Sequence, residues 1–192
     1  MSPSQIPTTK LPLPSSVLST GVGVFRDCTS LKSVEISSGM EWVCNYMFAG
    51  CTSLSTVVMP DSVTKLGIGV FYNCDSLTAV PIGNNVSIIG AGAFEDCDGF
   101  TEFTVHDNVT YIGKRAFGSC NGLKILIIGS GVIHIKGSVF EDCTRLSYAE
   151  FIIDEGWGLV HLSQHIPIDV SDPYDMAGIL SKGNGRPYLR TE

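Results

Sequence analysis

Cysteine is the residue type whose spacing in this sequence most strongly suggests chemistry. Six of the seven cysteines follow one another at intervals of 23 residues. They are Cys28, Cys51, Cys74, Cys97, Cys120 and Cys143. Regularly spaced cysteines can form disulfides, bind a metal through their thiolates or carry out redox reactions. Which of these applies depends on the residues that surround each thiol.

Two apolar residues recur at the same interval, one on each side of every cysteine in the series. A phenylalanine lies three residues before each cysteine, and a leucine, once replaced by Phe100, lies three residues after it. The phenylalanines are Phe25, Phe48, Phe71, Phe94, Phe117 and Phe140, and the leucines are Leu31, Leu54, Leu77, Leu123 and Leu146. Because each cysteine lies between two core positions, we predict a ladder of reduced, buried thiols that pack as small hydrophobic side chains.

Disulfides and a metal site remain as alternatives for these cysteines. Equivalent positions in stacked repeats lie roughly 4.8 Å apart, a separation that a disulfide can span. A zinc site is less favoured, because the series lacks the Cys-x-x-Cys spacing. Cys44 is the odd cysteine, since it takes the place that Gly67, Gly90 and Gly113 hold in other copies.

A second set of chemically capable residues lies near the C-terminus. His161 and His165 are four residues apart, with Asp169, Asp172 and Asp175 close by. On a helix the two imidazoles would share a face and could bind a metal. The segment between them favours helix weakly and Pro167 follows at once, so we predict a surface cap rather than a metal site.

The sequence contains none of the common catalytic motifs. It has no phosphate-binding loop with the Gly-Lys-Ser/Thr ending, no Gly-x-Ser-x-Gly and no His-Glu-x-x-His. Two segments, Gly67-Ile68-Gly69 and Gly90-Ala91-Gly92, resemble dinucleotide-binding loops, but they occupy equivalent repeat positions and are predicted to be bends. We therefore predict no catalytic residue, no metal and no cofactor.

The elements that position these residues repeat with the same period. The pattern reads Val-x-x-Ile-Gly-x-x-Ala-Phe-x-x-Cys-x-x-Leu-x-x-Val-x-Ile and is clearest in residues 109–128. Its last part alternates apolar and polar residues, which predicts a short strand, and its first part predicts a second one. The Ala-Phe-x-x-Cys-x-x-Leu part has the spacing of one or two helical turns. We predict a repeat solenoid with short parallel strands and short helical turns, that is, an α/β solenoid.

Composition limits the partners and the location of the chain. Its 192 residues are 44% hydrophobic and 16% charged, which is enough apolar residues to bury a core. The formal net charge of −7 argues against a nucleic-acid partner. No apolar run reaches the length of about 18 residues needed for a membrane span. Residues 1–16 lack the basic and apolar regions of a secretory signal, so the location stays open.

The repeat divides the chain into three parts. Residues 1–16 contain four prolines and are predicted to be an extended arm that is either disordered or lies along the first coil. Residues 17–152 hold the six copies. Residues 153–192 are predicted to form a C-terminal cap and tail, with a strand at 166–170, a short helix at 174–180 and a loose tail from 181 onward.

The repeat resembles the BspA-like branch of the leucine-rich-repeat family. That unit reads roughly Ile-Gly-x-x-Ala-Phe-x-x-Cys-x-x-Leu-x-x-Ile-x-Ile-Pro, and the match begins clearly at Ile89-Gly90 and continues through Ala93-Phe94 to Cys97. The proline that often closes the unit occurs here only at Pro60. The resemblance implies a binding or scaffold role similar to that of bacterial surface adhesins, a cell-surface location and no catalytic residues to transfer.

Outward residues on the predicted strands are the candidate binding residues. Rows of equivalent positions should form parallel lines on the surface. The residues that we predict to bind a protein or glycan ligand are Trp42, Ile88, Tyr111, Ile125, Ile127 and Tyr148. For Trp42 and Tyr111, packing against neighbouring side chains is the alternative. The acidic residues Glu95, Asp96, Asp98, Glu141 and Asp142 are predicted to form a solvated edge.

The leading functional prediction is a non-enzymatic binding module, either adhesin-like or part of an attachment protein. The alternative is a structural subunit of a larger assembly, whose terminal arms hold neighbouring subunits.

Overall fold

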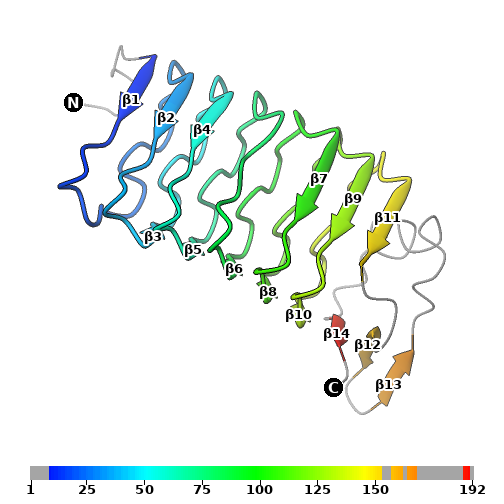
Figure 1. Ribbon diagram of the computed structural model, residues 1–192. Coiled ribbons are helices and arrows are strands. Elements are labelled where there is room, and N and C mark those ends of the chain that lie inside the picture. Colours follow the sequence, from blue (N-terminus) through cyan, green and yellow to red (C-terminus); the bar gives the residue numbers. More distant parts are fainter. Residues whose placement is uncertain (1–8, 153–156, 162–163, 168–187, 191–192) are drawn as a thin grey trace.

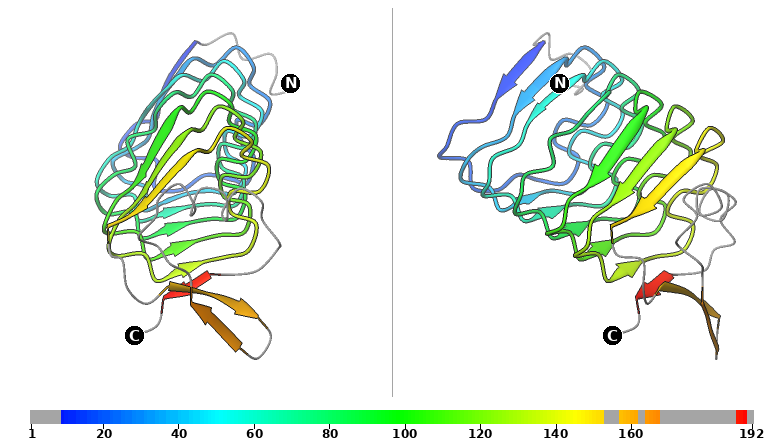
Figure 2. Two further views of the ribbon diagram at one scale, coloured as in Figure 1. Left: turned by 90° about the vertical axis from the view of Figure 1, so that its right-hand side faces the viewer. Right: turned by 45° about the vertical axis from the view of Figure 1, so that its right-hand side comes forward.

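The computed structural model describes residues 9–152, 157–161, 164–167 and 188–190. The chain winds into a parallel β-solenoid in which each coil repeats the previous one after 23 residues (Figure 1). Coil 1 begins at Lys10, and the next five begin at Ser33, Thr56, Ala79, Glu102 and Ile125. This confirms the predicted repeat solenoid. Three sides enclose the core, two made of strands and one made of turns (Figure 2).

The first strand of each coil contributes to one side, the long-strand face. Here β1 (Lys10–Pro12), β2 (Ser33–Glu35) and β4 (Thr56–Val58) form one parallel sheet. A second parallel sheet contains β7 (Glu102–Val105), β9 (Ile125–Ile128) and β11 (Tyr148–Phe151). Strand β1 lies within the proline-rich arm and pairs with β2 through Leu11 and Val34. Residues 10–12 therefore lie along the following coil.

Coil 4 interrupts the long-strand face. Residues 79–82 form no strand, although they lie one repeat after β4 and one repeat before β7. Pro81 occupies the position of Val58 and Thr104, and proline has no amide hydrogen to donate to a neighbouring strand. The amide of Ile82 instead bonds to the carbonyl of Val80 at 2.8 Å. The two sheets on this face are consequently separate.

The second side, the short-strand face, runs through the array without such a break. Its parallel strands are β3 (Trp42–Val43), β5 (Lys65–Leu66), β6 (Ile88–Ile89), β8 (Tyr111–Ile112) and β10 (His134–Ile135). Three antiparallel strands extend it at the C-terminal end: β14 (Tyr188–Arg190), β12 (Trp157–His161) and β13 (Gln164–Pro167). The segment 188–190, expected in a loose tail, is thus a strand. The helix expected at 174–180 lies outside the described residues.

The third side, the turn face, corrects the prediction of helical turns. Among residues 9–152 the segment around each Phe-x-x-Cys is a series of tight turns. In coil 2, Tyr46 has a φ of 55° and Gly50 a φ of 74°, left-handed values that end a helix. Alternate amides bond to the next coil instead, as from Tyr46 to Ile68 at 2.8 Å and from Phe48 to Val70 at 2.9 Å. These bonds between coils replace the bonds within a helix.

The core contains the repeated residues in vertical stacks. The six phenylalanine rings of the repeat stack with neighbouring centroids 5.3 to 5.7 Å apart. All seven cysteines lie within residues 9–152, and all are buried without a disulfide. The thiol of Cys97 donates to the carbonyl of Phe71 in the preceding coil at 3.0 Å, and Cys120 donates to Phe94 in the same way. Each of these thiols thus satisfies a buried carbonyl, a role beyond apolar packing.

Candidate functional site

The six predicted binding residues lie on two different faces. Trp42, Ile88 and Tyr111 belong to β3, β6 and β8, where the register places them in one row with Lys65. The other three belong to β9 and β11 on the long-strand face. The structure therefore does not bring the six together into one site.

Within the short-strand row, Trp42 is the most exposed of the predicted residues. It is 45% exposed, whereas Ile88 and Tyr111 are half-buried. The ammonium of Lys136 lies 5.6 Å from the centroid of the Tyr111 ring, a cation–π contact that covers part of this ring.

The other three predicted residues form a continuous apolar patch, which we call the long-strand patch. Ile125 pairs with Tyr148 across β9 and β11, and Ile127 lies two residues further along β9. Ile125 is 38% exposed, and the other two are half-buried. The hydroxyl of Tyr148 donates to Glu150 at 3.2 Å, which places an acidic group at the edge of the patch.

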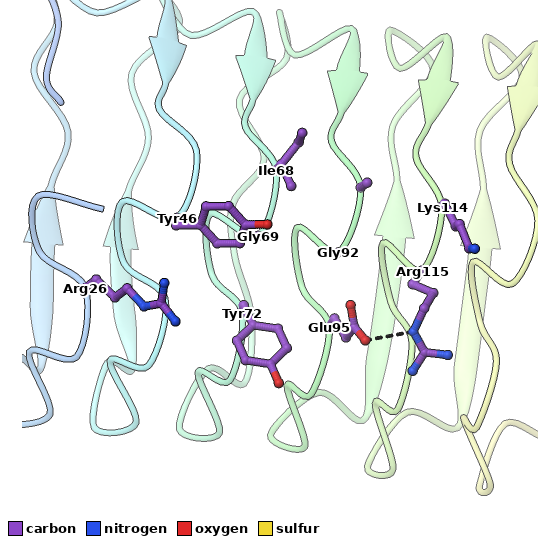
Figure 3. A pocket seen from close by; sticks show the side chains of 10 residues that line it. Arg26, Tyr46, Ile68, Gly69, Tyr72, Gly92, Glu95, Lys114 and Arg115 are labelled. Atoms are coloured by element: carbon purple, nitrogen blue, oxygen red, sulfur yellow. Dashed lines mark hydrogen bonds and ion pairs between the residues drawn. The ribbon is translucent and has the colours of Figure 1, made fainter. Parts of the chain in front are cut away.

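Sequence reasoning missed a groove on the turn face (Figure 3). This turn-face groove has a volume of about 490 Å³, within the usual range for small-ligand sites. It crosses five coils, and its lining residues are Arg26, Tyr46, Ile68, Gly69, Tyr72, Ala91, Gly92, Glu95, Lys114 and Arg115.

Two glycines form the floor of the groove. Gly69 and Gly92 take the repeat position that Tyr46 and Arg115 hold in the flanking coils. Gly69 also lets the Tyr46 ring lie across it, because a Cβ at Gly69 would collide with the ring carbons of Tyr46. The feature of the sequence that indicates the groove is therefore the presence of glycine in some copies and of a large residue in others at one repeat position.

One wall of the groove is a network of charged side chains. Arg115 bonds through Nε to Oε1 of Glu95 at 2.7 Å and through Nη1 to Oε2 of Glu141 at 2.6 Å. The bond to Glu95 is the main cause that raises the pKa of Arg115. Glu95 and Glu141 are thus engaged, which corrects the prediction that they lie on a solvated edge. On the other side, a hydrogen bond to Asp96 raises the pKa of Tyr72.

The buried thiols have low chemical reactivity. Burial raises the pKa of Cys51 to about 12, mainly because the thiolate would lose its hydration. The same cause raises the pKa of Cys74 and Cys97. Since the thiolate is the reactive form, these cysteines are poorly suited to act as nucleophiles or metal ligands.

The described residues contain no cluster of three or more side chains suited to a metal ion. His161 and His165 lie in β12 and β13, where His161 pairs with Gln164 and His165 pairs with Val160. The helical spacing on which a metal site would depend is therefore absent from this segment.

Comparison with known families decides the classification of the repeat. The sequence model of the BspA type leucine-rich repeat region matches six copies, over residues 4–124 and 65–154. The chain belongs to this BspA-type leucine-rich-repeat family. Such proteins are typically surface or adhesion proteins, and their repeat arrays are typically not catalytic. Comparison with curated protein sequences found no match.

Solved structures of bacterial leucine-rich-repeat proteins share the fold. The T. pallidum leucine-rich-repeat protein TpLRR is 24% identical with a TM-score of 0.64, and the match covers 72% of this chain and 62% of that one. A Bacteroides ovatus leucine-rich-repeat protein is 24% identical with a TM-score of 0.63, over 73% and 39%. A Faecalibacterium prausnitzii leucine-rich cell-surface protein is 23% identical with a TM-score of 0.63, over 77% and 48%. The matched region thus spans less than two thirds of each of these proteins.

The described segments contain no helix with the length and apolar character required to cross a membrane.

Proposed function

We propose that this BspA-type array is a non-enzymatic binding module of an attachment protein and that its long-strand patch contacts a protein partner. The observation that supports this most is the exposure of Ile125 beside Tyr148 and Ile127 on a regular, rigid sheet. Apolar side chains held on an exposed sheet favour contact with another surface. Family membership supports an attachment role, and a cell-surface location is part of the same proposal.

The charges around the patch define the partner further. The two outward rows of the long-strand face carry Glu35, Glu102 and Glu150, and from coil 2 onward these rows contain no basic residue. A partner with an apolar centre and a basic rim would complement this face, because opposite potentials favour docking and speed association. Charge complementarity therefore favours a protein over an acidic glycan on this face.

The test is surface plasmon resonance with the chain immobilised and purified extracellular-matrix and cell-surface proteins in solution. Ile125→Glu should weaken binding to any partner found by about tenfold or more, since it replaces an apolar contact with a charge that must be desolvated. Ile133→Glu is the matched control, because Ile133 is 43% exposed and lies beside β10, away from this patch.

Three outcomes would count against the proposal. Equal binding by Ile125→Glu, Tyr148→Ala and the parent chain would exclude the patch, and loss of binding only in Trp42→Ala would favour the short-strand row. Light scattering on the same protein tests the assembly alternative, because self-association at micromolar concentration would favour a subunit of a larger structure.

A further inference from the structure

We propose that the turn-face groove is a saccharide-binding site, with sugar rings packed on Tyr46 and Tyr72 and sugar hydroxyls bonded to the Glu95–Arg115 pair. This site lies on a different side of the solenoid from the long-strand patch. It is independent of the function proposed above, and either proposal can fail without the other.

The groove is a departure from the repeat rather than a requirement of the fold. At this repeat position Tyr46, Arg115 and Ser138 adopt φ values of 55°, 53° and 60°, close to the 57° of Gly69 and Gly92. The backbone therefore accepts large side chains there, at the modest cost of a left-handed conformation. Glycine in coils 3 and 4 keeps the floor of the groove low: the Tyr46 ring lies across Gly69, and a Cβ at Gly92 would lie 2.9 Å from Oε2 of Glu95.

One part of the groove suits the apolar face of a sugar ring. Tyr46 is 38% exposed, and Ile68 in the adjacent coil is 44% exposed. Figure 3 shows Tyr46, Ile68 and Tyr72 grouped on one side of the floor. Tyrosine combines an apolar ring with a polar tip. Such a surface can pack against the C–H groups of a pyranose while its hydroxyl bonds to the sugar.

The wall formed by Glu95 and Arg115 offers a hydrogen-bond acceptor beside hydrogen-bond donors. A guanidinium has five N–H groups, and Arg115 uses three of them on Glu95, Glu141 and Ser119, so two remain. Glu95 uses Oε1 for Arg115, and its Oε2 accepts no hydrogen bond from a described residue. Two adjacent sugar hydroxyls can then donate to Glu95 and accept from Arg115. Because the hydrogen bond between Arg115 and Glu95 already holds both side chains in place, neither loses much conformational freedom when a sugar binds.

The charges around the groove favour a neutral saccharide over an acidic one. Arg115 contacts the carboxylates of Glu95, Glu141 and Asp142, and Arg26 lies 3.6 Å from Asp27. Lys114 makes no ion pair with a described residue, but its single positive charge does not offset the excess of carboxylates beside Arg115. From Tyr46 in coil 2 to Lys114 in coil 5 the groove crosses three coil steps, roughly 14 Å at the usual strand spacing. That length accommodates a short oligosaccharide.

The test uses the full chain on a printed array of mammalian, plant and microbial glycans, followed by saturation-transfer difference NMR. The NMR probes are chitotriose, cellotriose and trigalacturonate. We expect binding on the array, transfer to pyranose ring protons, and tighter binding of chitotriose or cellotriose than of trigalacturonate. Tyr46→Ala should weaken binding by about tenfold. Gly92→Tyr, which introduces into coil 4 the residue that coil 2 carries at this repeat position, should fill the groove and abolish binding.

Matched controls separate a filled groove from a damaged fold. Tyr111→Ala removes a half-buried tyrosine from the short-strand face and should leave binding unchanged. Gly23→Ser introduces the residue that coil 6 carries at the same repeat position, at a glycine that does not line the groove, and should bind within about twofold of the parent chain. If Gly92→Tyr fails to fold, Tyr46→Ala decides alone. No binding across the array, or equal binding by Tyr46→Ala and the parent chain, overturns the proposal.

Discussion

Raising the pH above about 8.5 should destabilise this protein steeply, because four deeply buried thiols ionise readily only in the unfolded chain. Burial raises the pKa of Cys51 to about 12 and raises the pKa of Cys74 and Cys97. For Cys120 a hydrogen bond with Cys143 is the first cause and burial the second. Since the folded pKa is the higher one, the stabilisation is complete below about pH 8.5 and is lost as the pH rises towards the folded value.

The size of the effect follows from counting protons. Above about pH 9.5 the unfolded chain has released these four protons while the folded chain still holds them. The free energy of unfolding should then fall by about 1.4 kcal/mol per thiol for each pH unit. For the four thiols together, the loss is about 5 kcal/mol for each pH unit. Domains are typically stable by about 5–15 kcal/mol. The alkaline midpoint of unfolding is therefore expected between about pH 9.5 and 11.

Urea titrations followed by circular dichroism, from pH 7.5 to 10.5 with a phosphine reductant, measure this slope. Cys51→Ala removes one thiol and should make the slope shallower by about 1.4 kcal/mol per pH unit. Leu54→Ala is the matched control, since it removes a buried side chain and lowers stability at every pH without changing the proton count. A flat free energy between pH 9 and 10.5, or equal slopes for Cys51→Ala and the parent chain, would refute the reasoning.

Three further experiments, using five substitutions, test the packing of the coils. Phe117→Ala should cost about 3–5 kcal/mol and Phe25→Ala less, because Phe117 is fully buried and Phe25 only half-buried; urea denaturation gives the order, and equal costs would contradict it. Pro81→Val restores an amide and should stabilise by about 0.5–1.5 kcal/mol; hydrogen exchange should show new protection in residues 79–82, and unchanged exchange would oppose this account. Gly90→Ala should cost about 1–3 kcal/mol, because its Cβ would lie 2.7 Å from neighbouring backbone, whereas Gly21→Ala, with nothing within 4 Å, should leave the melting temperature nearly unchanged.

The strands and the buried cysteines could be predicted because both follow directly from local pattern. An alternating segment such as Leu31–Ile36 has one face for the core in any coil, and a cysteine between Phe and Leu must point inward with them. The turn face could not be predicted in the same way. Its spacing equals that of a helix, and the bonds that exclude a helix join residues 22 positions apart, as from Tyr46 to Ile68. Such contacts carry no local signature.

The groove is visible in the sequence only where the copies of the repeat differ from one another. The consensus of the repeats contains only what they share and predicts bends at the glycines of coils 3 and 4. Gly69 and Gly92 do lie in turns, but their neighbours at the same position are Tyr46 and Arg115. The ion pairs of Arg115 join residues 20 and 26 positions apart, so they too become visible only once the coils are stacked.

The interruption at Pro81 gives the array a preferred direction of bending. Between coils 3 and 5 the short-strand face and the turn face are continuous in hydrogen bonds, whereas the long-strand face is not. Opening the array on the long-strand side at coil 4 therefore breaks no strand pairing. Opening it on the short-strand side breaks strand pairing, and opening it on the turn side breaks the backbone hydrogen bonds between coils. We therefore expect the solenoid to bend most easily at coil 4, so that it can adapt there to the surface of a curved partner.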